Sequence, residues 1–117
     1  MPQDRDRVDR FLPLKPFVLD VLLELAEGKR HGWGLIRHIQ QHDGGGRILP
    51  ANFYRTLRAL RDDGLIEETA GDAVADPAER RQYFSLTTLG AKVARAEVKR
   101  LEALVVDPRA RRLLRSR

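Results

Sequence analysis

The chain of 117 residues contains no cysteine, which excludes a disulfide scaffold, a CxxC zinc site and a thiol nucleophile. Aromatic residues make up only 6% of the chain. No apolar run approaches the roughly 18 residues that a membrane-spanning helix needs. The first ten residues alternate Asp and Arg and have no apolar stretch typical of a secretory signal. These absences predict a cytoplasmic globular protein that does not contact a membrane.

Basic residues outnumber acidic ones by 22 to 17, which gives a formal net charge of +5. A hydrophobic fraction of 42% is enough to build a core, and a charged fraction of 33% suits a soluble domain. The length fits one domain. A basic excess favours polyanion partners, although many soluble proteins reach +5 without binding nucleic acid.

The spacing of apolar residues predicts three helices in the first half of the chain. The first covers residues 16–26 and ends before Gly28. The second covers residues 33–42, and the third covers residues 50–63. Apolar residues occupy about two thirds of the circumference of the first helix, whereas a surface helix of a monomer has a narrower stripe. The first helix is therefore predicted to have a second apolar neighbour besides its own core.

A hairpin and a long helix are predicted in the second half. Gly64 is predicted to cap the third helix in the left-handed conformation. Residues 65–66 and 83–86 are predicted as two short strands that a long polar loop connects. Thr87 is predicted to cap a fourth helix that covers residues 88–106.

This order of elements predicts a mainly α fold with a small β-hairpin, namely a winged helix-turn-helix followed by a C-terminal dimerisation helix. The predicted parts are an N-terminal arm (1–13), the winged helix-turn-helix DNA-binding domain (14–87), the dimerisation helix (88–106) and a basic tail (107–117). From Pro108 onward the tail has five arginines and no acid. It is interpreted either as a mobile arm that adds DNA affinity or as a frayed solubilising end.

Charge is segregated around the third helix, with four arginines and no acid from position 47 to 61, and seven acids and no base from position 62 to 79. In a major groove, Arg binds guanine and Asn binds adenine in a bidentate manner. The alternative is an ordinary solvated helix, because exposed arginines are common. The candidate DNA-binding residues in and before this helix are Arg47, Ala51, Asn52, Tyr54, Arg55 and Arg58.

Arg80 and Arg81 follow the polar loop of the hairpin, where a winged helix contacts the DNA backbone. Two arginines there would neutralise phosphates. The alternative is pairing with Asp76 and Glu79 in the same loop, which would contribute little energy.

A dimer seam is predicted on the fourth helix, where apolar residues recur at alternating intervals of three and four. An exposed seam of this width needs a partner, and the first helix has spare apolar surface. The alternative is that the two helices pack on each other within one chain. The predicted dimer interface consists of Val18, Leu22, Leu25, Ala91, Ala94, Val98, Leu101 and Val105.

Other candidate sites are weak. His38 and His42 have a zinc-compatible spacing, but no further ligands complete a set of four, so no metal is predicted. No nucleophile is accompanied by a base, so the chain is predicted not to be an enzyme and to need no cofactor. The runner-up function is a winged-helix module that binds proteins and not DNA.

Short motifs recur along the chain within residues 12–106. They are Leu14-Lys15-Pro16, Leu25-Ala26-Glu27-Gly28, His31-Gly32-Trp33, Pro50 to Tyr54, Leu57-Arg58-Ala59-Leu60, Asp63 to Glu67, Arg80 to Thr87, and Leu89-Gly90. In this order and spacing they resemble the PadR-like family of bacterial transcription regulators, in its short subtype with a single C-terminal helix. The resemblance implies a homodimeric repressor on a pseudo-palindromic site in double-stranded DNA, with Asn52, Tyr54, Arg55 and Arg58 on or beside the DNA-facing surface.

The resemblance also implies that a small aromatic or amphipathic effector releases the DNA in some members. Trp33 and Phe17 are the candidate pocket residues, and the alternative is that they pack in the core. Trp33 replaces the family's usual tyrosine. Leu49 replaces a serine cap, which predicts a poorer N-cap for the third helix.

Overall fold

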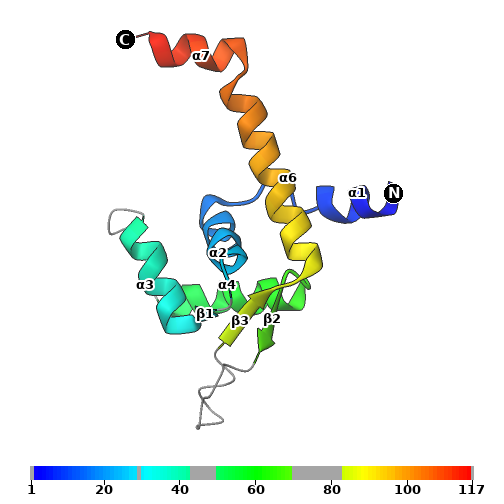
Figure 1. Ribbon diagram of the computed structural model, residues 1–117, viewed down its shortest axis with the longest axis vertical. Coiled ribbons are helices and arrows are strands. Elements are labelled where there is room, and N and C mark those ends of the chain that lie inside the picture. The colour runs from blue at the N-terminus through cyan, green and yellow to red at the C-terminus, as the bar shows by residue number, and fades with distance from the viewer. Residues whose placement is uncertain (1, 29, 43–49, 70–82, 117) are drawn as a thin grey trace.

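Helices α2, α3 and α4 and a small antiparallel sheet form the body of the molecule, and α6 runs out of this body to α7 (Figure 1). The computed structural model describes residues 2–28, 30–42, 50–69 and 83–116. In chain order the elements are α1 (Pro2–Asp9), α2 (Pro16–Ala26), β1 (Arg30–His31), α3 (Gly32–His42), α4 (Pro50–Asp62), β2 (Ile66–Thr69), β3 (Tyr83–Leu86), α6 (Thr88–Val105) and α7 (Pro108–Arg115). The predicted winged helix-turn-helix fold is confirmed.

Local signals in the sequence fix several of the helix ends. Helix α2 begins with a proline in its first turn, where the missing N–H costs nothing. Gly64 has a φ of 82° and ends α4 in the left-handed conformation, as predicted. The Thr87 hydroxyl caps α6 by accepting a hydrogen bond of 2.9 Å from the Gly90 N–H, as predicted.

The sheet has the strand order β1-β3-β2, and both pairings are antiparallel. Strands β2 and β3 form the predicted hairpin, with Ile66 opposite Leu86 and Thr69 opposite Tyr83. Strand β1 was not predicted, because two residues carry no periodicity. Its pairing with β3 ties the start of α3 to the hairpin.

Both terminal segments contain a helix that the sequence did not predict. Helix α1 lies in the segment expected to be an arm, and its Val8 is buried in the common core. Helix α7 lies in the expected tail, where the Asp107 carboxylate caps it by accepting from the Arg109 N–H at 2.8 Å. The Asp-Pro pair at its start is a recognisable helix-start signal. Across the described ranges, no helix is both long enough and apolar enough to cross a membrane.

A single core joins α2, α3, α4, the hairpin and the first half of α6. Its buried members are Val8, Val21, Leu22, Leu25, Leu35, Ile36, Ile39, Phe53, Leu57, Leu60, Leu65, Ile66, Phe84, Val93 and Ala94. The second neighbour predicted for α2 is therefore α6 of the same protomer. The two helices thus pack on each other within one chain, which was the alternative to pairing them across a dimer.

The start of α6 approaches the end of α4 closely enough to require a glycine. Thr87 donates its backbone N–H to the Leu65 carbonyl at 3.1 Å and its hydroxyl to the Gly64 carbonyl at 2.6 Å. A Cβ on Gly90 would overlap the same Leu65 carbonyl oxygen and would meet Leu86 Cδ1 at 2.8 Å.

Gly90→Ala should therefore destabilise the fold by about 1–3 kcal/mol, because the backbone it meets cannot move aside cheaply. Gly34 in α3 is the matched control, since a Cβ there meets nothing within 4 Å. Gly34→Ala should stabilise the protein by about 0.4–1 kcal/mol. Urea unfolding of the three proteins measures both values, and equal midpoints for the two variants would contradict the described packing.

A buried carboxylate connects α6 to the segment before α2. Glu97 is 1% exposed, and its Oε2 accepts from the Leu14 backbone N–H at 2.7 Å. Its Oε1 accepts from Nε of Arg100, which lies one turn later on the same helix. The Arg100 guanidinium, followed by the Leu14 N–H, lowers the pKa of Glu97 below its ordinary value despite the opposing effect of burial.

Because the pKa of Glu97 is lower in the folded chain than in the unfolded one, its charge stabilises the fold fully above the ordinary value of 4.5 and less as the pH falls below it. Glu97→Gln should cost about 1–3 kcal/mol at pH 7. The difference in the free energy of unfolding between this variant and the unmutated protein should shrink as the pH falls below 4.5. Urea midpoints measured against pH test this, with Glu102→Gln on the exposed face of α6 as the control. A cost that stays constant with pH would contradict it.

Candidate nucleic-acid interface

Helix α4 divides into a buried face and an exposed polar face. Phe53, Leu57 and Leu60 fall at i, i+4 and i+7 and are buried against the core. The opposite arc carries small and polar residues that are all exposed, namely Asn52, Arg55, Arg58 and Ala59. An exposed face that mixes an amide, two guanidinium groups and a small side chain has the chemistry to contact base edges in a major groove.

The arginines of α4 differ in whether they already bind a carboxylate of the same chain. Arg61 donates to Glu68 Oε1 on β2 at 2.7 Å and to Asp62 Oδ1 at 3.4 Å. The hydrogen bond to Glu68, followed by the charge of Asp62, raises the pKa of Arg61. Within the described part of the chain, neither Arg55 nor Arg58 forms an ion pair. Arg61 thus ties α4 to the hairpin, whereas Arg55 and Arg58 are available to an external anion.

The remaining predicted DNA-binding residues divide into two groups. Tyr54 is half-buried, and its ring meets that of Phe53 edge-on with centroids 5.6 Å apart. It therefore lies beside the exposed face. Ala51 is in α4, but its side chain is outside the described residues, as are Arg47, Arg80 and Arg81.

Phe17 is one of the two predicted pocket residues, and it packs against the core. Its ring lies edge-on to Phe53 with centroids 5.9 Å apart. This contact fits the core-packing alternative for Phe17. The side chain of Trp33 is outside the described residues.

The histidine pair does not gather further ligands in the described ranges. His38 lies with its Nδ1 3.6 Å from the Glu24 carboxylate, between α3 and α2. The side chain of His42 is outside the described residues. Among the residues that the structure describes, no group of three or more His, Asp or Glu side chains is arranged to hold a metal ion.

The predicted dimer residues are distributed between the core and the surface. Leu22, Leu25 and Ala94 are buried in the protomer's own core, so the prediction is corrected for these three. Val18 and Leu101 are partly exposed, and Ala91, Val98 and Val105 are exposed. Five further large apolar residues are exposed outside the predicted interface, namely Leu23, Leu104, Val106, Leu113 and Leu114.

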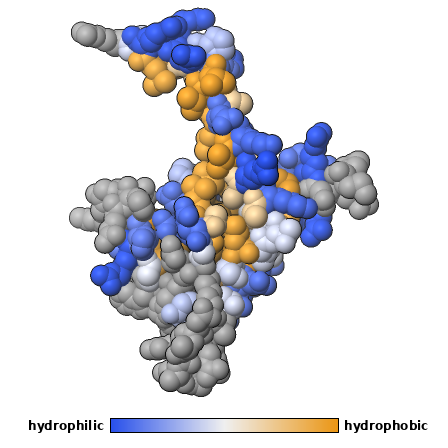
Figure 2. All heavy atoms as spheres, in the orientation of Figure 1, coloured by the Kyte–Doolittle hydropathy of each residue, from blue (hydrophilic) through white to orange (hydrophobic). Residues whose placement is uncertain are grey.

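The exposed apolar residues of α6 continue the stripe that is buried lower on the same helix. Val93, Ala94 and Glu97 face the body, and Leu101, Leu104 and Val105 follow on that side, where α6 has passed the body. Figure 2 shows a continuous apolar band from α7 down α6 onto the body of the molecule. The second half of α6 thus presents the same face, and none of the helices and strands in the described ranges covers it.

The comparisons agree on the family and the fold. The profile of the transcriptional regulator PadR-like family matches residues 21–96, which is more than half of the chain. Among solved structures, the hsRosR-S4 complex aligns at 22% identity over 95% of this chain and 89% of its own, with a TM-score of 0.67. RosR of H. salinarum aligns at 23% identity over 89% of each chain, with a TM-score of 0.63. A transcriptional regulator from Clostridium thermocellum, Cth-833, aligns at 21% identity over 75% of this chain and 84% of its own, with a TM-score of 0.63.

The chain therefore belongs to the PadR-like family of transcriptional regulators, which confirms the resemblance carried by its motifs. The structural likeness at these identities shows the shared winged-helix fold. A comparison with curated proteins gives no match. The family places the chain among DNA-binding regulators of transcription.

Proposed function

We propose that the protein is a homodimeric repressor that binds a pseudo-palindromic operator through the exposed face of α4. The observation that carries this proposal is the pair Arg55 and Arg58, which are exposed beside Asn52 and have no carboxylate partner in the described part of the chain. The N-terminal residues of a recognition helix usually contact base edges, and Asn52 and Arg55 lie in the first two turns of α4.

The hairpin complements α4 as the second contact. Arg80 and Arg81 lie three and two residues before the described start of β3 at Tyr83, and we assign them to the DNA backbone beside the groove. In this arrangement α4 supplies sequence preference, and the loop of the hairpin supplies affinity that depends on salt.

The proposed dimer is formed by the second half of α6. Val98 is 42% exposed and Val105 is 59% exposed, and both lie on a helix that extends past the body. Two copies that cover this surface symmetrically would present two recognition helices. Two recognition helices related by a two-fold axis match an operator with two half-sites. Repression then follows if the operator overlaps the site where transcription starts.

Arg55→Ala should lower operator affinity by about 1–3 kcal/mol and relax the preference at one base pair per half-site, because a bidentate contact to guanine is lost. Selection of DNA sequences by the two proteins, followed by titration of the selected duplex, measures both effects. Lys92→Ala on the exposed face of α6 is a control for a general loss of positive charge. An Arg55→Ala protein that keeps its sequence preference would contradict the role given to α4.

In the same titrations, Arg80→Ala combined with Arg81→Ala should weaken binding to all duplexes alike. The slope of log affinity against log salt should flatten by up to about two units, since two phosphate contacts are lost. A change in sequence preference here would reverse the two roles. If the unmutated protein binds no selected duplex better than random DNA, the winged-helix domain acts as a protein-binding module instead.

Val98→Glu combined with Leu101→Glu should convert the dimer to monomers or aggregates, because two carboxylates per protomer would be buried without partners. Gel filtration measures the mass of the protein in solution, and a gel-shift assay measures operator binding. The variant should lose the dimer and operator binding together. Lys99→Glu, on the opposite side of α6, controls for the added negative charge. A Val98→Glu, Leu101→Glu protein that remains a dimer would place the interface elsewhere.

A further inference from the structure

Helix α7 has apolar side chains that no described part of its own protomer covers. Leu113 and Leu114 are 75% and 78% exposed, respectively. With Ala110 they form one face of the helix, and Arg112 lies on the opposite face. A helix of eight residues with two exposed leucines is too short to be stable by itself in water, so its order depends on a contact made by that apolar face.

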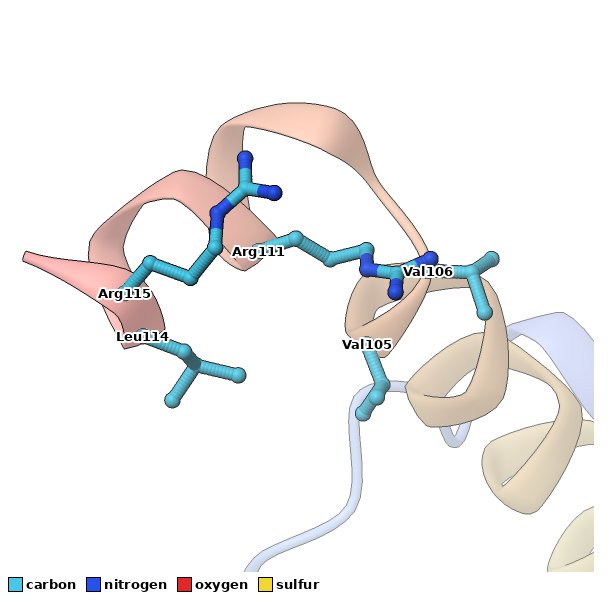
Figure 3. Close-up of a pocket in the computed structure, with 5 residues that line it drawn as sticks. All are labelled: Val105, Val106, Arg111, Leu114 and Arg115. Carbon is cyan, nitrogen blue, oxygen red and sulfur yellow. The ribbon is translucent and has the colours of Figure 1, made fainter.

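The junction of α6 and α7 forms a hollow of about 460 Å³. We call it the elbow, and Val105, Val106, Arg111, Leu114 and Arg115 line it. In Figure 3, Leu114 of α7 and Val105 of α6 lie on the same side of the elbow, and Arg111 reaches from α7 towards the end of α6. The elbow is thus an apolar concavity with two guanidinium groups at its edge.

The face of α2 turned away from the core has the opposite charge. Asp20, Leu23, Glu24 and Glu27 recur at i, i+3, i+4 and i+7, which places them on one face of the helix. They line a groove of about 370 Å³ between α2 and α3. Leu23 is 42% exposed in the middle of the three carboxylates. The outer face of α2 therefore offers an apolar side chain beside carboxylates, one of which, Glu24, already faces His38 Nδ1 at 3.6 Å.

We infer that the elbow of each protomer clasps the outer face of α2 of a second copy. Val105 and Leu114 would pack around the partner's Leu23, and Arg111 and Arg115 would face the carboxylates beside it. The inference rests on the proposed homodimer and assigns a second contact within it, made twice by the two-fold symmetry. It is continuous with the apolar surface of α6, because Val105 belongs to both.

Two features favour a second copy over other occupants. Figure 1 shows α7 at the end of α6 away from the body, at the opposite end of the molecule from the hairpin. A DNA-binding arm would use the arginines and leave the leucines exposed. The groove on α2 supplies both the apolar contact and the opposite charge from a surface that this chain carries.

The absence of cysteine makes the contact directly testable by cross-linking. Leu23→Cys and Leu114→Cys proteins, each with a different tag, are mixed, allowed to exchange subunits and treated with a short bis-maleimide. The inference expects a covalent dimer that carries both tags. Arg112→Cys, on the other face of α7, replaces Leu114→Cys as the matched control and should give much less of this product. Equal yields from the two pairs would overturn the inference.

A second measurement distinguishes the contact between the elbow and the partner's α2, here called the clasp, from the dimer contact of α6. Leu114→Ser should weaken dimerisation at least about tenfold, because it removes a buried leucine contact at two symmetric sites. Arg111→Glu should weaken it by about two- to fivefold, and Glu27→Arg in the same chain should restore it. Sedimentation of the unmutated protein comes first, and a monomer there would contradict the proposed function as well.

A dimer whose dissociation constant is unchanged by Leu114→Ser would overturn only the clasp. If Arg112→Ala lowers DNA affinity while Leu114→Ser leaves dimerisation intact, the clasp is again overturned, since α7 would then be a DNA-binding arm.

Discussion

The packing of α6 on α2 is the constraint on which the rest of the structure depends. Val93 and Ala94 close the core over Val21, Leu22 and Leu25, and the Glu97 carboxylate fixes the same helix to the Leu14 backbone. Below this contact, Thr87 and Gly90 seat the start of α6 against the end of α4. The direction of α6 is thereby set by the DNA-binding domain. A change of its direction would move the two α4 helices of the proposed dimer relative to each other.

The arginines that the structure describes differ in whether they bind a carboxylate of the same protomer. Arg61, Arg100 and Arg109 each bind a carboxylate of the same protomer, and they fix α4 to the hairpin, α6 to its buried glutamate and the start of α7 to Asp107. Arg55 and Arg58 have no such partner in the described ranges and project from the exposed face of α4. The net charge of +5 does not distinguish these groups. Only the position of the acidic residues in the fold separates structural arginines from those available to DNA.

Much of the fold could be predicted from the sequence because its signals are local. Pro16, Gly64 and Thr87 mark helix ends through their own backbone geometry or hydrogen bonds, and the period of Phe53, Leu57 and Leu60 shows which face of α4 is buried. The exposed positions of Asn52, Arg55 and Arg58 follow from the same period. The burial of Leu22, Leu25 and Ala94 within one protomer could not be predicted, because a wide apolar arc does not reveal which chain covers it. Helix α1 was missed because Val8 is the one buried side chain among those of its residues whose burial the structure describes.

The central claim is that the exposed second half of α6 joins two protomers on one DNA site. Sedimentation equilibrium of the unmutated protein, alone and with the duplex it selects, tests this claim most directly. The account predicts a dimer at micromolar concentration without DNA, and a complex of two protomers with one duplex. A monomer without DNA that also binds the selected duplex as a single protomer would contradict it.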